Sequence, residues 1–217
     1  MQAVLDRMQK LPDLHFEAGK YLFAACIASV FPCDAIALTV VERSLGLHKG
    51  FQHLMRNGYY TSGVGLLRMQ LDNALRLHGI ANCDDPHSVA CQVVTGTPLR
   101  KLKDRTGMPM TDKRLVEIYS EKREWSKRIY DLASGYVHLS EQHVGHFLAR
   151  SPKNEFGQRN FFVGDSDDHV SSEHKLQLAE AFETVTFGVL AEVRGWADAR
   201  HRFGTKEQLE VLYGKDS

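Results

Sequence analysis

Apolar residues recur at steps of three and four along two long stretches of this chain, residues 57–80 and 171–202. This spacing places the apolar side chains on one face of an α-helix. The first stripe is Val64, Leu67, Leu71, Leu75 and either Leu77 or His78, and the second is Leu176, Ala179, Phe182, Val185, Val189, Val193 and Trp196. A long helix with one apolar face must cover that face with other helices, so the pattern predicts a helical bundle.

Shorter helices are indicated by apolar runs that follow residues able to cap a helix N-terminus. We expect them at about residues 13–31, 34–47, 86–94, 112–120 and 121–135, with caps at Asp84 or Asp85, at Thr111 or Asp112, and at Ser171 or Ser172 for the final helix. By contrast, short apolar runs around residues 147 and 161 flank a polar turn, which predicts a β-hairpin at about residues 144–166. The expected fold class is all-α: a single helical domain over residues 1–217, with this hairpin inserted before a long C-terminal helix.

Charge, hydropathy and cysteine content limit the partners and the cellular compartment that we expect. The 27 basic and 27 acidic residues cancel, so the chain has no overall attraction for nucleic acid or an anionic membrane. The apolar segment 21–41 is long enough to cross a membrane, but Pro32 and Asp34 interrupt it, and two buried helices fit the pattern better. The four cysteines form no C-x-x-C motif and accompany no secretory signal, so we expect reduced thiols in a cytoplasmic protein. We expect no cofactor.

Polar side chains are concentrated at two places. Residues 128–143, at the end of a predicted helix, include one arginine, one aspartate, two tyrosines and two histidines. On the helix predicted at 57–80, Arg68 and Asp72 are four residues apart and share a face. That spacing permits an exposed ion pair that contributes a few tenths of a kcal/mol, or a partly buried pair that orients a group from another helix. The sequence favours neither interpretation.

Two motifs in these segments resemble a bacterial all-helical family of unknown function that is similar to the abortive-infection and HEPN-like proteins. They are Leu66-Leu-Arg-Met-Gln-Leu-Asp72 and, about sixty residues later, Tyr130-Asp-Leu-Ala-Ser-Gly-Tyr-Val-His138. The resemblance spans about residues 35–140, and it implies a site made of four residues: Arg68, Asp72, Tyr130 and His138. The acidic residue of the first motif is usually glutamate in that family and is aspartate here.

HEPN ribonucleases have an arginine and a histidine separated by four to six residues. The histidine acts on the RNA 2′-hydroxyl or leaving oxygen, and the arginine stabilises the phosphorane charge. Arg128 is too far from His138 for this motif. Two other pairs have the spacing, Arg43 with His48 and Arg194 with His201. About two such matches are expected by chance from the arginine and histidine content, so they carry no weight.

Two functions remain open. The first, implied by the resemblance, is a metal-independent ribonuclease or toxin of a phage-defence system, with His138 as acid or base and Arg68 or Arg128 at the phosphate. The second is a non-catalytic helical interaction module, in which a buried network holds the helices in register. The members of that network would be the four residues of the resemblance: Arg68, Asp72, Tyr130 and His138.

Partners follow from the same hypotheses. RNA is a partner only of the ribonuclease. His138, His143 and His146 offer three imidazoles, but neither helical nor extended spacing places all three on one face, so no metal site is predicted. The C-terminal helix carries Phe187 and Leu190 outside its main apolar stripe. We expect this second apolar face to form a two-fold homodimer.

Overall fold

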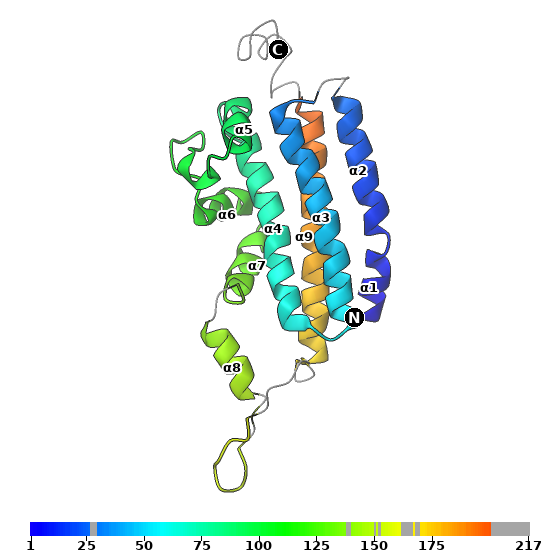
Figure 1. The fold of residues 1–217 in the computed structure, drawn as a ribbon, viewed down its shortest axis with the longest axis vertical. Helices are drawn as coiled ribbons and strands as arrows, with labels where there is room; N and C mark the ends of the chain where they lie inside the picture. The colour runs from blue at the N-terminus through cyan, green and yellow to red at the C-terminus, as the bar shows by residue number, and fades with distance from the viewer. Residues whose placement is uncertain are drawn as a thin grey trace, which may run out of the picture.

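The computed structural model describes residues 1–26, 30–137, 140–149, 151, 153–161, 167 and 170–200. Figure 1 shows a bundle of long helices in which α3 runs antiparallel to the other three, with the short helix α1 below α2. The bundle helices are α1 (Gln2–Met8), α2 (Leu11–Ala25), α3 (Pro32–Arg56), α4 (Tyr60–Ala81) and α9 (Ser172–Asp198). Helix α9 contacts all four of the others and therefore forms the centre of the bundle. Both predicted apolar stripes are buried there, with Leu67, Phe182 and Trp196 at most 1% exposed.

The first part of the connection between the parallel helices α4 and α9 forms a side layer on the bundle (Figure 1). This layer contains α5 (Pro86–Val94), the 3-10 helix η1 (Leu99–Lys101), α6 (Asp112–Ser120) and α7 (Trp125–Ser134), and α8 (Glu141–Ala149) follows it in the chain. Helices α6 and α7 pack on α4 and on each other. Helix α6 approaches α4 closely at Gly79, where a Cβ would overlap Leu115 Cδ2 and force that side chain to shift. This close packing places the start of α6 beside the middle of α4.

Helix starts agree with the capping residues expected from the sequence. The side chains of Asp85, Thr111 and Ser171 accept hydrogen bonds from the third N–H groups of α5, α6 and α9. The interruption predicted in the apolar segment 21–41 is the start of α3, where Asp34 Oδ2 accepts the Phe31 N–H at 2.9 Å.

Among the described helices, none is both long enough and apolar enough to span a membrane. All four cysteines lie in the described part of the chain and form no disulfide there.

The predicted β-hairpin at residues 144–166 is wrong, since none of the described residues belongs to a strand. Residues 141–149 form α8 instead, because Val144, Phe147 and Leu148 recur at helical steps. Beyond it, the polar segment closes a tight turn with one bridge between Lys153 and Arg159. Asn154 Oδ1 accepts hydrogen bonds from two backbone N–H groups inside that turn. These N–H groups are therefore bonded to a side chain and not to a neighbouring strand.

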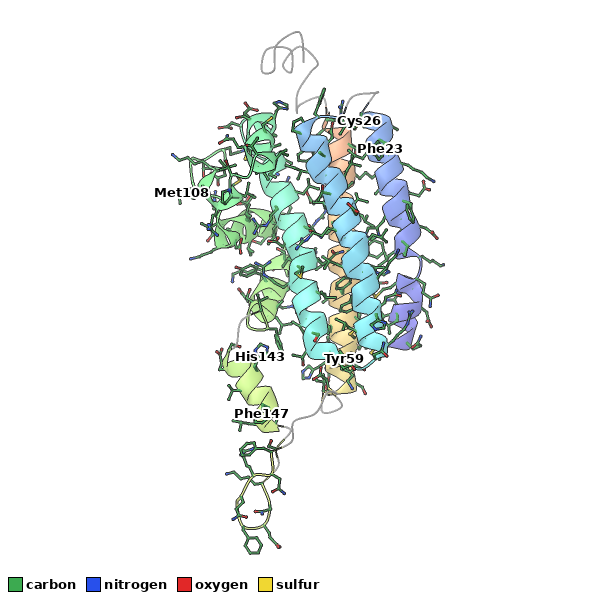
Figure 2. The ribbon with its side chains drawn as sticks, in the orientation of Figure 1. Phe23, Cys26, Tyr59, Met108, His143 and Phe147 are labelled. Carbon is green, nitrogen blue, oxygen red and sulfur yellow. The ribbon has the colours of Figure 1, made fainter. Side chains whose placement is uncertain are left out.

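Helix α8 extends away from the bundle, as the positions of His143 and Phe147 show in Figure 2. It makes no extensive contact with another described helix. The His143 ring of α8 nevertheless packs against Tyr136, two residues after the end of α7, with the ring centroids 5.5 Å apart.

Candidate functional site

Asp72 on α4 is the centre of a cluster of charged side chains. Its Oδ2 atom lies 2.7 Å from Arg76 Nε and 4.0 Å from Arg43 Nη1 of α3. Its Oδ1 atom lies 3.7 Å from Arg68 Nη1, one helical turn earlier. The predicted pair of Arg68 and Asp72 therefore exists, as part of a larger network. Their side chains are only 11% and 18% exposed, which agrees with the interpretation of a partly buried pair.

Asp112, the first residue of α6, supplies the second carboxylate of this cluster. Its two oxygens accept hydrogen bonds from Arg68 Nη2 at 3.3 Å and Arg76 Nη2 at 3.1 Å. Burial opposes the charge on Arg76, but the carboxylates of Asp72 and Asp112 outweigh that effect and raise the pKa of Arg76. Because the carboxylate belongs to α6 and the guanidinium groups to α4, the cluster fastens the side layer to the bundle.

Tyr130 on α7 completes the surroundings of Arg68. The Arg68 Cζ atom lies 4.4 Å from the centroid of the Tyr130 ring, which is the geometry of a cation–π contact. The guanidinium is thus held by two carboxylates and one aromatic face. Arg68, Asp72 and Tyr130 therefore lie together, and Arg68 makes one hydrogen bond to Asp112, one longer ion pair to Asp72 and one ring contact to Tyr130.

Arg128 lies apart from this cluster. It precedes the buried residue Ile129 on α7, which separates it from Tyr130. It borders a pocket of about 600 Å³ between α4, α7 and α9, lined by Tyr60, Thr61, Val64, Arg128, Ile129, Leu132, Tyr136, Val170, His174, Gln177, Leu178 and Ala181. Within the described part of the chain, no hydrogen bond or ion pair holds the Arg128 guanidinium. The structure therefore separates two arginines that the sequence grouped as candidates for a phosphate.

The histidine candidates are placed only in part. His138 lies outside the described residues, as do the side chain of His146 and all of His201. Of the two pairs with HEPN spacing, Arg43 and His48 are in the bundle, where His48 is 1% exposed. The Arg43 guanidinium donates to Asn73 Oδ1 and to the Met69 carbonyl. A histidine buried in this way has no route to RNA.

A second polar network, which sequence reasoning missed, runs through the core of the bundle. His15 Nε2 lies 2.8 Å from Ser44 Oγ, and Gln70 Nε2 donates both to Ser44 Oγ at 2.6 Å and to Thr186 Oγ1 at 3.0 Å. These four side chains come from α2, α3, α4 and α9 and are all 0% exposed. The contact between histidine and serine is therefore structural, because no substrate reaches it. Burial lowers the pKa of His15 and, on the neighbouring turn of α3, lowers the pKa of His48 to about 4.

Sequence reasoning also missed three members of the charged cluster: Arg43, Arg76 and Asp112. The i+4 step from Asp72 to Arg76 was visible in the sequence. The positions of Arg43 and Asp112 depend on helix packing, and no local pattern carries that information.

The chain matches no model of a known family, no curated protein and no solved structure. The resemblance to HEPN-like proteins therefore remains a prediction from two short motifs. What the side chains can do follows from their geometry.

Proposed function

We propose that this chain is a non-catalytic helical interaction module, in which the Arg68–Asp72–Tyr130 cluster is structural. The observation that carries the proposal is that the Arg68 side chain is 11% exposed and lies between the carboxylates of Asp72 and Asp112 and the ring of Tyr130. A catalytic arginine must offer donors to a developing charge. To do so, Arg68 would have to break contacts that hold α6 and α7 on α4.

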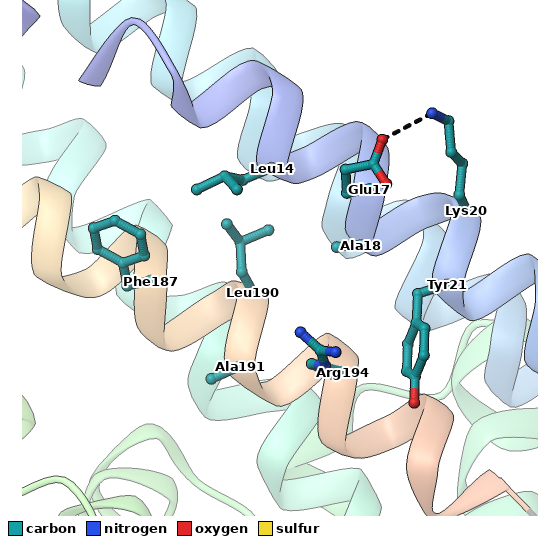
Figure 3. A pocket seen from close by; sticks show the side chains of 9 residues that line it. All are labelled: Leu14, Glu17, Ala18, Lys20, Tyr21, Phe187, Leu190, Ala191 and Arg194. Atoms are coloured by element: carbon teal, nitrogen blue, oxygen red, sulfur yellow. Dashed lines mark hydrogen bonds and ion pairs between the residues drawn. The ribbon is translucent and has the colours of Figure 1, made fainter. Parts of the chain in front are cut away.

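The partner in this proposal is a second copy of the chain, bound along a groove between α2 and α9 (Figure 3). The groove is lined by Leu14, Glu17, Ala18, Lys20, Tyr21, Phe187, Leu190, Ala191 and Arg194. The second apolar face expected on α9 from Phe187 and Leu190 is smaller than the sequence indicates. Helix α2 covers Leu190 and leaves it 9% exposed. Phe187 and Leu14 remain 49% and 41% exposed on the two sides of the groove. These side chains are the apolar surface that a second copy would cover.

The charges on α9 support a two-fold arrangement. Glu180 lies seven residues before Phe187, and Arg194 lies seven residues after it. Seven residues are close to two helical turns, so all three side chains share one face, and all three are exposed. If two α9 helices pack antiparallel with Phe187 at the axis, each Glu180 faces the Arg194 of the other copy. This surface is complementary to itself, as a two-fold interface requires.

Light scattering at tens of micromolar protein tests the self-association. We expect a dimer mass for the wild type, and a Kd raised about 100-fold or more in Phe187→Glu, as for a central aromatic contact. Phe16→Glu is the matched control, because Phe16 is 59% exposed on α2 and does not line the groove. A monomer mass for the wild type would contradict the proposal.

Charge reversal tests the register of the two helices. Glu180→Arg alone places two cations opposite each other and should weaken the dimer. The double variant Glu180→Arg with Arg194→Glu should restore it, because the pair is then reversed and still matched. Equal dimer affinities in the single and double variants would exclude this register.

The metal-independent ribonuclease of a phage-defence type is the second candidate, and one observation favours it. Arg128, without a partner among the described residues, lines the same pocket as Tyr136, and His138 follows Tyr136 by two residues in the sequence. If this function holds, His138→Ala should abolish RNA cleavage or toxicity while leaving Tm nearly unchanged, since a catalytic group acts on the transition state. Purified wild-type protein that leaves RNA intact would exclude this candidate.

A further inference from the structure

The pocket between α4, α7 and α9 has the size and wall chemistry of a small-molecule site. Its volume of about 600 Å³ falls within the range of known ligand cavities. Aliphatic side chains from three helices form one part of the wall: Val64 of α4, Ile129 and Leu132 of α7, and Leu178 and Ala181 of α9. Leu132 remains 56% exposed at the edge. A ligand with a hydrocarbon body would remove this apolar surface from water.

Two cationic side chains of the described residues lie at or next to the pocket, those of Arg128 and Lys175. Arg128 lines the pocket directly, and the Lys175 ammonium lies 4.3 Å from the ring centroid of Tyr60, another lining residue. Asp167 is an acid of the described residues in this region, and its Oδ2 atom already accepts the Thr61 N–H at 2.8 Å.

Two acids close to Arg128 and His174 on the same helices also have partners already. Asp131 on α7 accepts a hydrogen bond from Lys127 at 2.7 Å, and Glu173 on α9 accepts one from Gln177 at 3.2 Å. Arg128 thus has no carboxylate partner among the described residues. An anion brought by a ligand would supply one.

From these observations we propose that this pocket binds an amphipathic anion: a carboxylate on a hydrocarbon chain of roughly eight to ten carbons. The guanidinium of Arg128 pairs with the carboxylate, which matches its planar pair of donors. The chain lies against the aliphatic wall. A neutral hydrocarbon would leave Arg128 unused, and a polyanion such as RNA would leave the apolar wall exposed. This site is separate from the groove between α2 and α9 and does not depend on self-association.

Calorimetric titration and thermal unfolding with octanoate test the proposal. Octanoate should bind with one site per chain and raise Tm by about 3 °C at roughly ten times its Kd. Octanol and octylammonium, which have the same chain and no negative charge, should bind at least about tenfold more weakly. Phe187→Glu should bind octanoate like the wild type, so that a failure of the dimer and a failure of this site are distinguishable.

Variants of α7 give the decisive comparison. Arg128→Gln should lose the preference for octanoate over octanol, and Arg128→Glu should prefer octylammonium. Lys122→Gln is the control, because it removes an exposed cation just before α7 that does not line the pocket and pairs with no acid among the described residues. The proposal is overturned if octanoate does not bind, if octanol binds equally well, or if Arg128→Gln binds octanoate like the wild type.

Discussion

Arg68 and Arg128 belong to the same corner of the molecule and have opposite surroundings. Arg68 is held between two carboxylates and the ring of Tyr130, with its side chain 11% exposed. Arg128, on the far side of Ile129, is exposed at the edge of an apolar pocket and has no ion pair among the described residues. The comparison teaches that the partners of an arginine, more than its presence in a motif, indicate its role. Arg68 is held by protein groups, whereas Arg128 is available to bind a ligand.

The largest effect should come from removing the central carboxylate of the Arg68 cluster. Asp72→Asn leaves Arg43, Arg68 and Arg76 close together with only Asp112 to balance them. We expect a loss of about 2–3 kcal/mol in the free energy of unfolding, less than for a fully buried pair because these side chains are partly solvated. Urea denaturation measures this loss. Arg128→Gln should stay within about 0.5 kcal/mol of the wild type, as a surface change does.

The two buried histidines of the bundle core, His15 and His48, should make the stability of the protein depend on pH, whereas the arginines of the cluster keep their charge at all pH values in question. His48 has a pKa of about 4 in the folded protein, because burial opposes its protonation. The unfolded chain binds the proton near pH 6.5, so stability is present above that value and is lost as pH falls toward 4. Between pH 7 and pH 5 the loss is about 2 kcal/mol from His48, and His15 acts in the same direction.

The variant His48→Leu tests this assignment, since the aliphatic side chain has a similar volume and cannot bind a proton. Its free energy of unfolding should depend less steeply on pH between 7 and 5 than that of the wild type. An unchanged pH dependence would show that His48 is not the group responsible.

Much of the fold could be predicted from local sequence signals, because helix starts depend on local chemistry. Asp85, Thr111 and Ser171 were recognisable as caps, and the apolar stripe of α4 was recognisable from its period. The short helix α1 was missed. The error at α8 arose because Val144, Phe147 and Leu148 lie close to a polar turn, and a short apolar run does not distinguish a helix from a strand.

The candidate site was less predictable, for a different physical reason. The pair of Arg68 and Asp72 is local to one helix and was found, but its partner Asp112 is brought in by α6, which packs closely on α4 at Gly79. The separation of Arg128 from Tyr130 likewise depends on which faces of α7 pack against α4. Both the position of Asp112 and the separation of Arg128 from Tyr130 depend on contacts between helices, which cannot be inferred from the spacing of residues in the sequence.

The smallest loss of stability should come from replacing Tyr130, which separates the contribution of its ring from that of the carboxylates around Arg68. Tyr130→Leu removes the cation–π contact while keeping an apolar side chain, and should lower the free energy of unfolding by about 1 kcal/mol. Tyr130→Phe keeps the ring and should differ from the wild type by less than about 0.5 kcal/mol. Thermal unfolding of the two variants side by side measures the difference. Equal losses would mean that the hydroxyl group, and not the ring, stabilises this position.

The most direct test of the contrast between the two arginines measures Tm for Asp72→Asn and Arg128→Gln, each with and without octanoate. We predict a low Tm and a retained octanoate shift for Asp72→Asn, since the cluster is structural and the pocket is intact. For Arg128→Gln we predict a wild-type Tm and no preference for octanoate over octanol. The opposite pattern, a stable Asp72→Asn protein and an Arg128→Gln protein with the full octanoate shift, would contradict the roles assigned to these two regions.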